Sequence, residues 1–135
     1  MAKTAVVILL LRTITGILFF FQGYDKLFNI KVPNVVKAFN ESYARLIPGP
    51  LLFLAVYCSS LIELLAGICL FLGVFKIYAL YALCVNLFFV AFSFSLIKPM
   101  WDMQFYFPRL ILISALLLLS GMNDPFSLQA FLKLN

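Results

Sequence analysis

The chain has 135 residues, of which 65% are hydrophobic and only 11% are charged, and its mean hydropathy is +1.12. A soluble domain of this length could not bury so much apolar surface behind so few charges, so lipid must replace water as the main solvent. The ten basic and five acidic residues are scattered along short loops. No basic run with interleaved aromatic residues occurs, and the sequence therefore argues against nucleic acid as a partner.

Two of the usual ligands of metals and cofactors are missing or scattered. Histidine is absent, which removes the common ligand of haem and zinc and the common proton shuttle. The three cysteines, Cys58, Cys69 and Cys84, each stand alone in an apolar run without a C-x-x-C motif. We interpret them as small buried hydrophobic residues. The sequence thus predicts no metal, no haem and no catalytic residues.

The first apolar run covers residues 5–23, about the 20 residues that a helix needs to cross roughly 30 Å of hydrocarbon. In the connection that follows, apolar residues recur at helical spacing from Val32 to Ile47, opposite polar residues such as Lys37 and Glu41. This pattern predicts a short amphipathic helix that lies in the membrane interface. The sequence Ile-Pro-Gly-Pro at residues 47–50 then ends this helix and turns the chain back.

Three further apolar runs cover residues 51–73, 77–97 and 104–121. Because only a tight turn separates the first two of these runs, they are expected to be antiparallel neighbours. The predicted fold is all-α: a single transmembrane domain over residues 1–135, in which four helices form a bundle. Both ends of the chain should lie on the same side of the bilayer.

Two charged residues lie in the middle of apolar runs, Arg12 in the first and Glu63 in the second. Each costs about 2.5 to 3.5 kcal/mol at the centre of a bilayer, so both need compensation. At 1.5 Å per residue, counting from the side that holds the N-terminus places them within about 5 Å of one depth. Asn86 and Ser114 lie near this depth in the other two runs. The sequence therefore predicts a buried polar cluster around an Arg12–Glu63 ion pair.

Small residues accompany the two charges along the predicted helices. Gly16 and Gly23 follow Arg12, and Gly67 follows Glu63 by one turn, and small residues let membrane helices approach closely. The ion pair has two interpretations. It could fix the register of the helices, or it could line a polar site for a ligand headgroup or a proton.

A second group of charges is expected on the opposite side of the membrane. Asp25 and Lys26 end the first run, and Asp102 and Arg109 lie near the start of the fourth. Residues in such places usually anchor helix ends in the headgroup region. We interpret these four as interface anchors, with a second charged cluster as the alternative.

Several of these residues fall into short motifs that occur in one order. The first run has Arg12 followed by Gly16 and then G-x-x-K-L at residues 23–27, and the second has E-L-x-x-G at residues 63–67 and L-x-L-G at residues 70–73. After the last run, Gly121 precedes Ser-Leu-Gln at residues 127–129. In this order the motifs resemble those of the DoxX-like four-helix membrane proteins, in which the last motif is Ser-Leu-Asp.

The resemblance implies a four-helix bundle in a bacterial cytoplasmic membrane and an association with thiol chemistry and quinones. It carries over to Arg12, Gly16, Gly23, Lys26, Glu63 and Gly67. Redox-active relatives in the wider superfamily use a cysteine pair, and this chain departs from them because it has none. The resemblance therefore does not imply a thiol–quinone oxidoreductase that acts alone.

Three functions are compatible with the sequence. The first is a non-catalytic subunit that stabilises a larger membrane complex, with other membrane subunits as partners. The second is a redox accessory that binds quinone or lipid at the Arg–Glu layer and needs partner proteins to pass electrons. The third is a small transporter with Arg12 and Glu63 as a coupling pair, although four short helices leave little room for alternating access.

Overall fold

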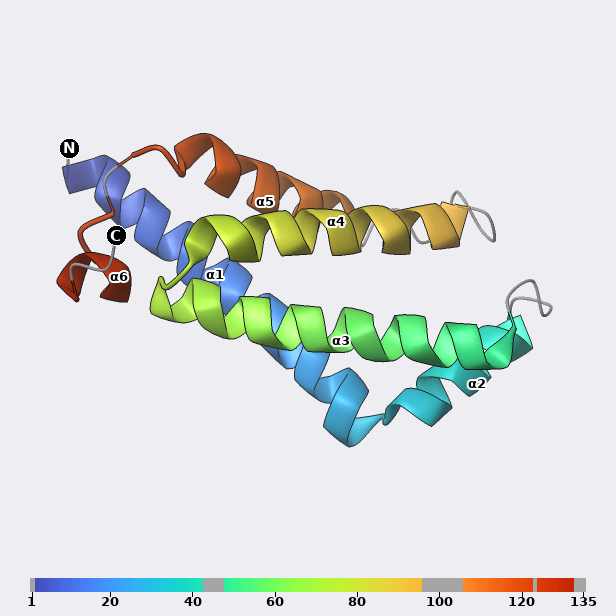
Figure 1. The fold of residues 1–135 in the computed structure, drawn as a ribbon. Coiled ribbons are helices and arrows are strands. Elements are labelled where there is room, and N and C mark those ends of the chain that lie inside the picture. The colour runs from blue at the N-terminus through green and yellow to red at the C-terminus, as the bar shows by residue number, and fades with distance from the viewer. Residues whose placement is uncertain (1, 43–47, 96–105, 123, 133–135) are drawn as a thin grey trace.

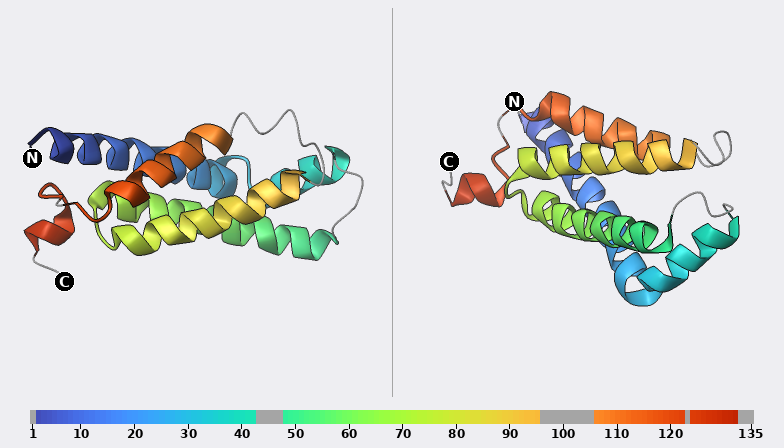
Figure 2. Two further views of the ribbon diagram at one scale, coloured as in Figure 1. Left: turned by 90° about the horizontal axis from the view of Figure 1, so that it is seen from above. Right: turned by 45° about the vertical axis from the view of Figure 1, so that its right-hand side comes forward.

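The computed structural model describes residues 2–42, 48–95, 106–122 and 124–132, and these residues form helices joined by short turns (Figure 1). The elements are α1 (Ala2–Tyr24), the π-helical turn η1 (Asp25–Asn29), α2 (Val32–Ser42), α3 (Gly49–Leu72), α4 (Lys76–Ser95), α5 (Tyr106–Leu119) and α6 (Leu128–Phe131). The start of α1 lies at the same end of the bundle as α6 and the turn between α3 and α4 (Figures 1 and 2). The short helix α2 lies beside α3 at the other end.

Three of the described helical segments are long and apolar enough to cross a membrane. They are residues 3–29, 49–72 and 76–93, with mean hydropathies of 2.2, 2.1 and 1.7. The apolar helix α5 is shorter, with 14 residues. Large apolar side chains are exposed along these helices, as lipid-facing surfaces require. The described residues therefore form an all-α membrane protein with several apolar helices, and the expected start of the fourth span at residue 104 lies outside them.

The most extensive contact in the structure joins α1 and α3. Gly16 and Gly67 lie against each other's helices, and a Cβ added to Gly67 would lie 2.5 Å from the backbone nitrogen of Phe20. A Cβ on Gly23 would lie 2.7 Å from the carbonyl oxygen of Ser60. Since each position has room only for hydrogen, these glycines allow the two backbones to touch.

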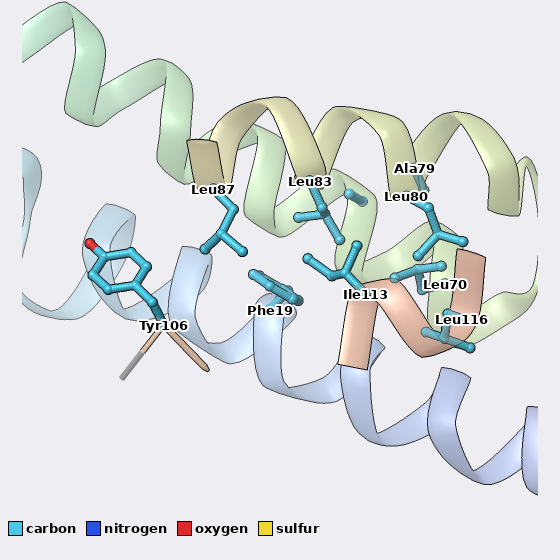
Figure 3. Packing of buried hydrophobic residues seen from close by; sticks show 10 residues of the cluster. Phe19, Leu70, Ala79, Leu80, Leu83, Leu87, Tyr106, Ile113 and Leu116 are labelled. Carbon is cyan, nitrogen blue, oxygen red and sulfur yellow. The ribbon is translucent and has the colours of Figure 1, made fainter. Parts of the chain in front are cut away.

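A small hydrophobic core fills the space between α1, α3, α4 and α5. Its side chains include Phe19 from α1, Leu70 from α3, Leu83 from α4 and Ile113 from α5, and Ile113 and Leu83 are completely buried (Figure 3). Thr15 and Ser60 are also fully buried. Their hydroxyl groups donate to the carbonyl oxygens of Leu11 and Val56 in their own helices, so both buried hydroxyl groups are satisfied.

We expect Gly67→Ala to destabilise the protein by about 1 to 3 kcal/mol, because the new methyl group must force α1 and α3 apart. Gly121→Ala is the matched control, since a Cβ there would meet nothing within 4 Å. The free energy of unfolding in detergent micelles, measured by titration with a denaturing detergent, checks both variants. Equal stability of the two would contradict the close contact.

Candidate functional site

Arg12 lies in a polar centre at the end of the bundle that holds α6. Its Nη1 donates to the carbonyl oxygens of Leu70 and Phe71 at 2.9 and 3.0 Å, and its Nη2 donates to that of Phe126 at 3.2 Å. The first two carbonyls belong to the last turn of α3, where a helix leaves carbonyl oxygens without their usual partners, and that of Leu70 also accepts from the backbone N–H of Gly73 at 3.2 Å. The guanidinium group therefore caps α3 from the side and ties the C-terminal segment to it.

Asp124 supplies the negative charge of this centre. Its Oδ2 lies 3.4 Å from Nε of Arg12 and 3.0 Å from Nζ of Lys76, and its side chain is only 1% exposed. The chain reaches this centre through the turn at Gly73, which has a φ of 73° and packs against the Arg12 guanidinium group. Glycine suits this left-handed position, and a side chain there would collide with Arg12.

Glu63 belongs to a second polar centre, which lies farther along α3. Nζ of Lys26 donates to both of its carboxylate oxygens, at 3.0 and 2.8 Å, and Nδ2 of Asn86 donates to Oε1 at 3.4 Å. The carboxylate is 4% exposed and the Lys26 side chain 24% exposed. The wide turn of η1 directly follows α1 and carries Lys26 back against α3.

The predicted Arg12–Glu63 ion pair is wrong, because the two residues face different levels of the bundle. Gly16 lies opposite Gly67 and Gly23 lies opposite Ser60. In this antiparallel register Arg12 lies opposite Phe71, eight residues beyond Glu63, which corresponds to about 12 Å along α3. The depths counted from the ends of the apolar runs gave the wrong register of the first helix against the second.

The structure also separates the remaining predicted site residues. Asn86 is buried beside Glu63, but Ser114 lies on the exposed face of α5 and takes no part in this cluster. Asp25 is exposed and accepts a hydrogen bond from Asn29, as an interface residue would. Lys26, expected to be an interface anchor, is instead the ion-pair partner of Glu63. Asp102 lies outside the described residues.

A cavity of about 640 Å³ opens beside the second centre, between the parts of α3 and α4 that lie away from their connecting turn. Its walls are mostly apolar and include side chains of α2, α3 and α4. Six polar residues also line it: Gln22, Lys26, Ser59, Asn86, Ser93 and Arg109. A volume of this size and a mainly apolar lining with a few polar groups are typical of small-molecule sites.

Two of the residues that line the cavity carry a polar atom that is buried without a hydrogen-bond partner among the described residues. These atoms are Oε1 of Gln22 and Oγ of Ser59. A buried polar atom without a hydrogen bond costs about 1 to 3 kcal/mol. Each atom would gain a partner if its side chain turned toward a ligand that offers a donor or an acceptor.

The sequence analysis missed Asp124 and Lys76. Asp124 lies just beyond an apolar run, in the turn after Gly121, where a charge looks solvated. Its position one residue before a proline in the final turn was the only signal available. Gln22 at the end of the first run and Ser59 one turn before Glu63 stand near the predicted charges, but no feature of the sequence indicates that they line a cavity.

Double-mutant cycles can test the two separate centres. We expect Arg12→Gln and Asp124→Asn to be coupled by about 0.5 to 3 kcal/mol in the free energy of unfolding, because the two groups touch. Arg12→Gln and Glu63→Gln should be additive within about 0.5 kcal/mol, because they share no partner. Unfolding in detergent micelles gives all the required values, and coupling of Arg12 with Glu63 instead would contradict the observed pairing.

A matched control for these variants is Lys37→Gln on α2. Lys37 and Glu41 form an ion pair with a distance of 3.9 Å, and their side chains are 75% and 67% exposed. Exposed pairs contribute about 0 to 1 kcal/mol. Removing either partner of the buried Arg12–Asp124 pair should cost about 3 to 5 kcal/mol, so the two classes of variant differ clearly.

Comparison with known proteins agrees with the motifs and with this architecture. The model of the DoxX family matches residues 7–96, which include Arg12, the three packing glycines and the Lys26–Glu63–Asn86 centre. No curated protein and no solved structure matches the chain. Since the matched segment covers about two thirds of the sequence, the chain belongs to the DoxX family of membrane proteins.

Proposed function

We propose that this protein binds a membrane-dissolved amphipathic ligand of the quinone or lipid class in the cavity between α3 and α4. The observation that carries the proposal is the largely apolar cavity itself, whose few polar lining residues include Gln22 and Ser59, each with a buried polar atom that has no partner among the described residues. Apolar walls would hold a ring or an acyl chain, and the polar groups would bind the headgroup.

The second polar centre gives the cavity a polar end that has no net charge. Lys26 and Asn86 line the cavity and both donate to Glu63. An ammonium group has three donors and an amide group has two, so both residues retain donors for a carbonyl or hydroxyl oxygen. The redox accessory predicted from the sequence would thus bind its ligand at the Lys26–Glu63–Asn86 centre, whereas the Arg12 centre does not line the cavity.

The other predicted roles stay predictions. A non-catalytic subunit of a membrane complex needs a partner surface, and the exposed apolar side chains of the described helices are equally suited to lipid. A location in a bacterial cytoplasmic membrane follows from the family resemblance. If electrons pass through a bound quinone, partner proteins must supply and remove them.

Filling the cavity should abolish ligand binding. We expect Ala55→Trp to weaken binding of a short-tailed quinone analogue at least about tenfold, because Ala55 lines the cavity and an indole ring would occupy it. Ala82→Trp is the matched control, since Ala82 is exposed on α4 and does not line the cavity. Equilibrium binding of the labelled analogue to the protein in lipid nanodiscs measures both.

The polar end of the ligand can be tested separately with Ser59→Ala, which removes a hydroxyl group that has no partner in the protein. The variant should fold as well as the wild type and bind the analogue about three- to tenfold more weakly, as the loss of one hydrogen bond predicts. Unchanged binding in both Ala55→Trp and Ser59→Ala would refute the proposed site.

A further inference from the structure

The charges around the cavity do not balance. Lys26 and Arg109 line it, and among the described residues no carboxylate does. Glu63 neutralises the charge of Lys26, because Nζ of Lys26 makes two short contacts with the Glu63 carboxylate. Arg109, in the first turn of α5, forms no ion pair within the described part of the chain and is half-buried. The described residues of the cavity lining therefore carry one uncompensated positive charge.

The position of Arg109 makes this charge costly without a counterion. It lies next to the apolar walls of the cavity and follows Tyr106, which is buried in the hydrophobic core. A cation that is partly removed from water gains most from an anion with matching geometry. The planar guanidinium group binds carboxylate and phosphate oxygens through two parallel hydrogen bonds.

Resting on the proposed function, we propose that the ligand is an acidic amphiphile. Its carboxylate or phosphate group binds Arg109, and its apolar chain lies against the walls formed by residues such as Val56 and Phe89. The neutral Lys26–Glu63 pair offers no net charge to the anion, so Arg109 determines the selectivity. The unpartnered oxygen atoms of Gln22 and Ser59 would bind further polar groups of the same ligand.

The matched probes are hexadecanoate and hexadecanol, which share a chain and differ in charge. We expect hexadecanoate to bind the protein in nanodiscs of zwitterionic lipid about 10- to 100-fold more tightly than hexadecanol, as one charge-assisted interaction predicts. Arg109→Gln should remove this difference. Arg109→Lys, which keeps the charge, should retain part of it, and Lys37→Gln on the exposed face of α2 should leave it unchanged.

Three further probes identify the source of the anion. Hexadecyl phosphate should compete with hexadecanoate, whereas acetate and inorganic phosphate at the same concentration should not, because they lack the chain. Competition by the small anions would show a site for a free anion and would overturn the amphiphile assignment.

The outcomes separate this inference from the proposed function. If hexadecanol and the quinone analogue bind as tightly as hexadecanoate, and Arg109→Gln changes none of them, the cavity binds neutral ligands and the acidic class is refuted. If no probe binds and Ala55→Trp has no effect, the proposed function itself fails.

Discussion

The close contact of α1 with α3 sets where Arg12 and Glu63 lie inside the bundle. Gly16, Gly23 and Gly67 leave no space between the two backbones, so the register of the helices cannot slide without a collision. In this register Arg12 lies beside the end of α3 and Glu63 lies near the end of α1. The packing of the small residues, rather than the attraction between charges, therefore decides which opposite charges meet.

The two polar centres compensate buried charge in different ways. Arg12 lies among carbonyl oxygens at the C-terminal end of α3, where the helix dipole favours a cation. Asp124 and Lys76 supply the other charges of that centre, in which Nε of Arg12 and Oδ1 of Asp124 are buried without a hydrogen bond among the described residues, and none of its residues lines the cavity. The Glu63 centre opens onto the cavity, because Lys26 and Asn86 line it. The first centre thus holds the fold together, and the second can respond to a ligand.

The composition and the apolar runs predict the helices well because hydrophobic length follows directly from sequence. Residues 5–23, 51–73 and 77–97 correspond to α1, α3 and α4, and the amphipathic segment that begins at Val32 is α2. The charge pairing could not be predicted in this way. It depends on a helix register set by three glycines and on the π-helical turn at Lys26, and apolar runs have no sharp ends from which such a register can be counted.

The pairing of Lys26 with Glu63 also determines what the cavity can recognise. Had Arg12 neutralised Glu63, Lys26 would have been free and the cavity would have carried two unpaired cations. Because Lys26 is paired with Glu63, Arg109 is the one unpaired charge among the described residues of the lining, and the Lys26–Glu63–Asn86 end of the cavity has no net charge. A site with one cation, uncharged hydrogen-bonding groups and apolar walls can distinguish ligands by one negative charge. In the low dielectric of a membrane protein this difference is larger than it would be in water.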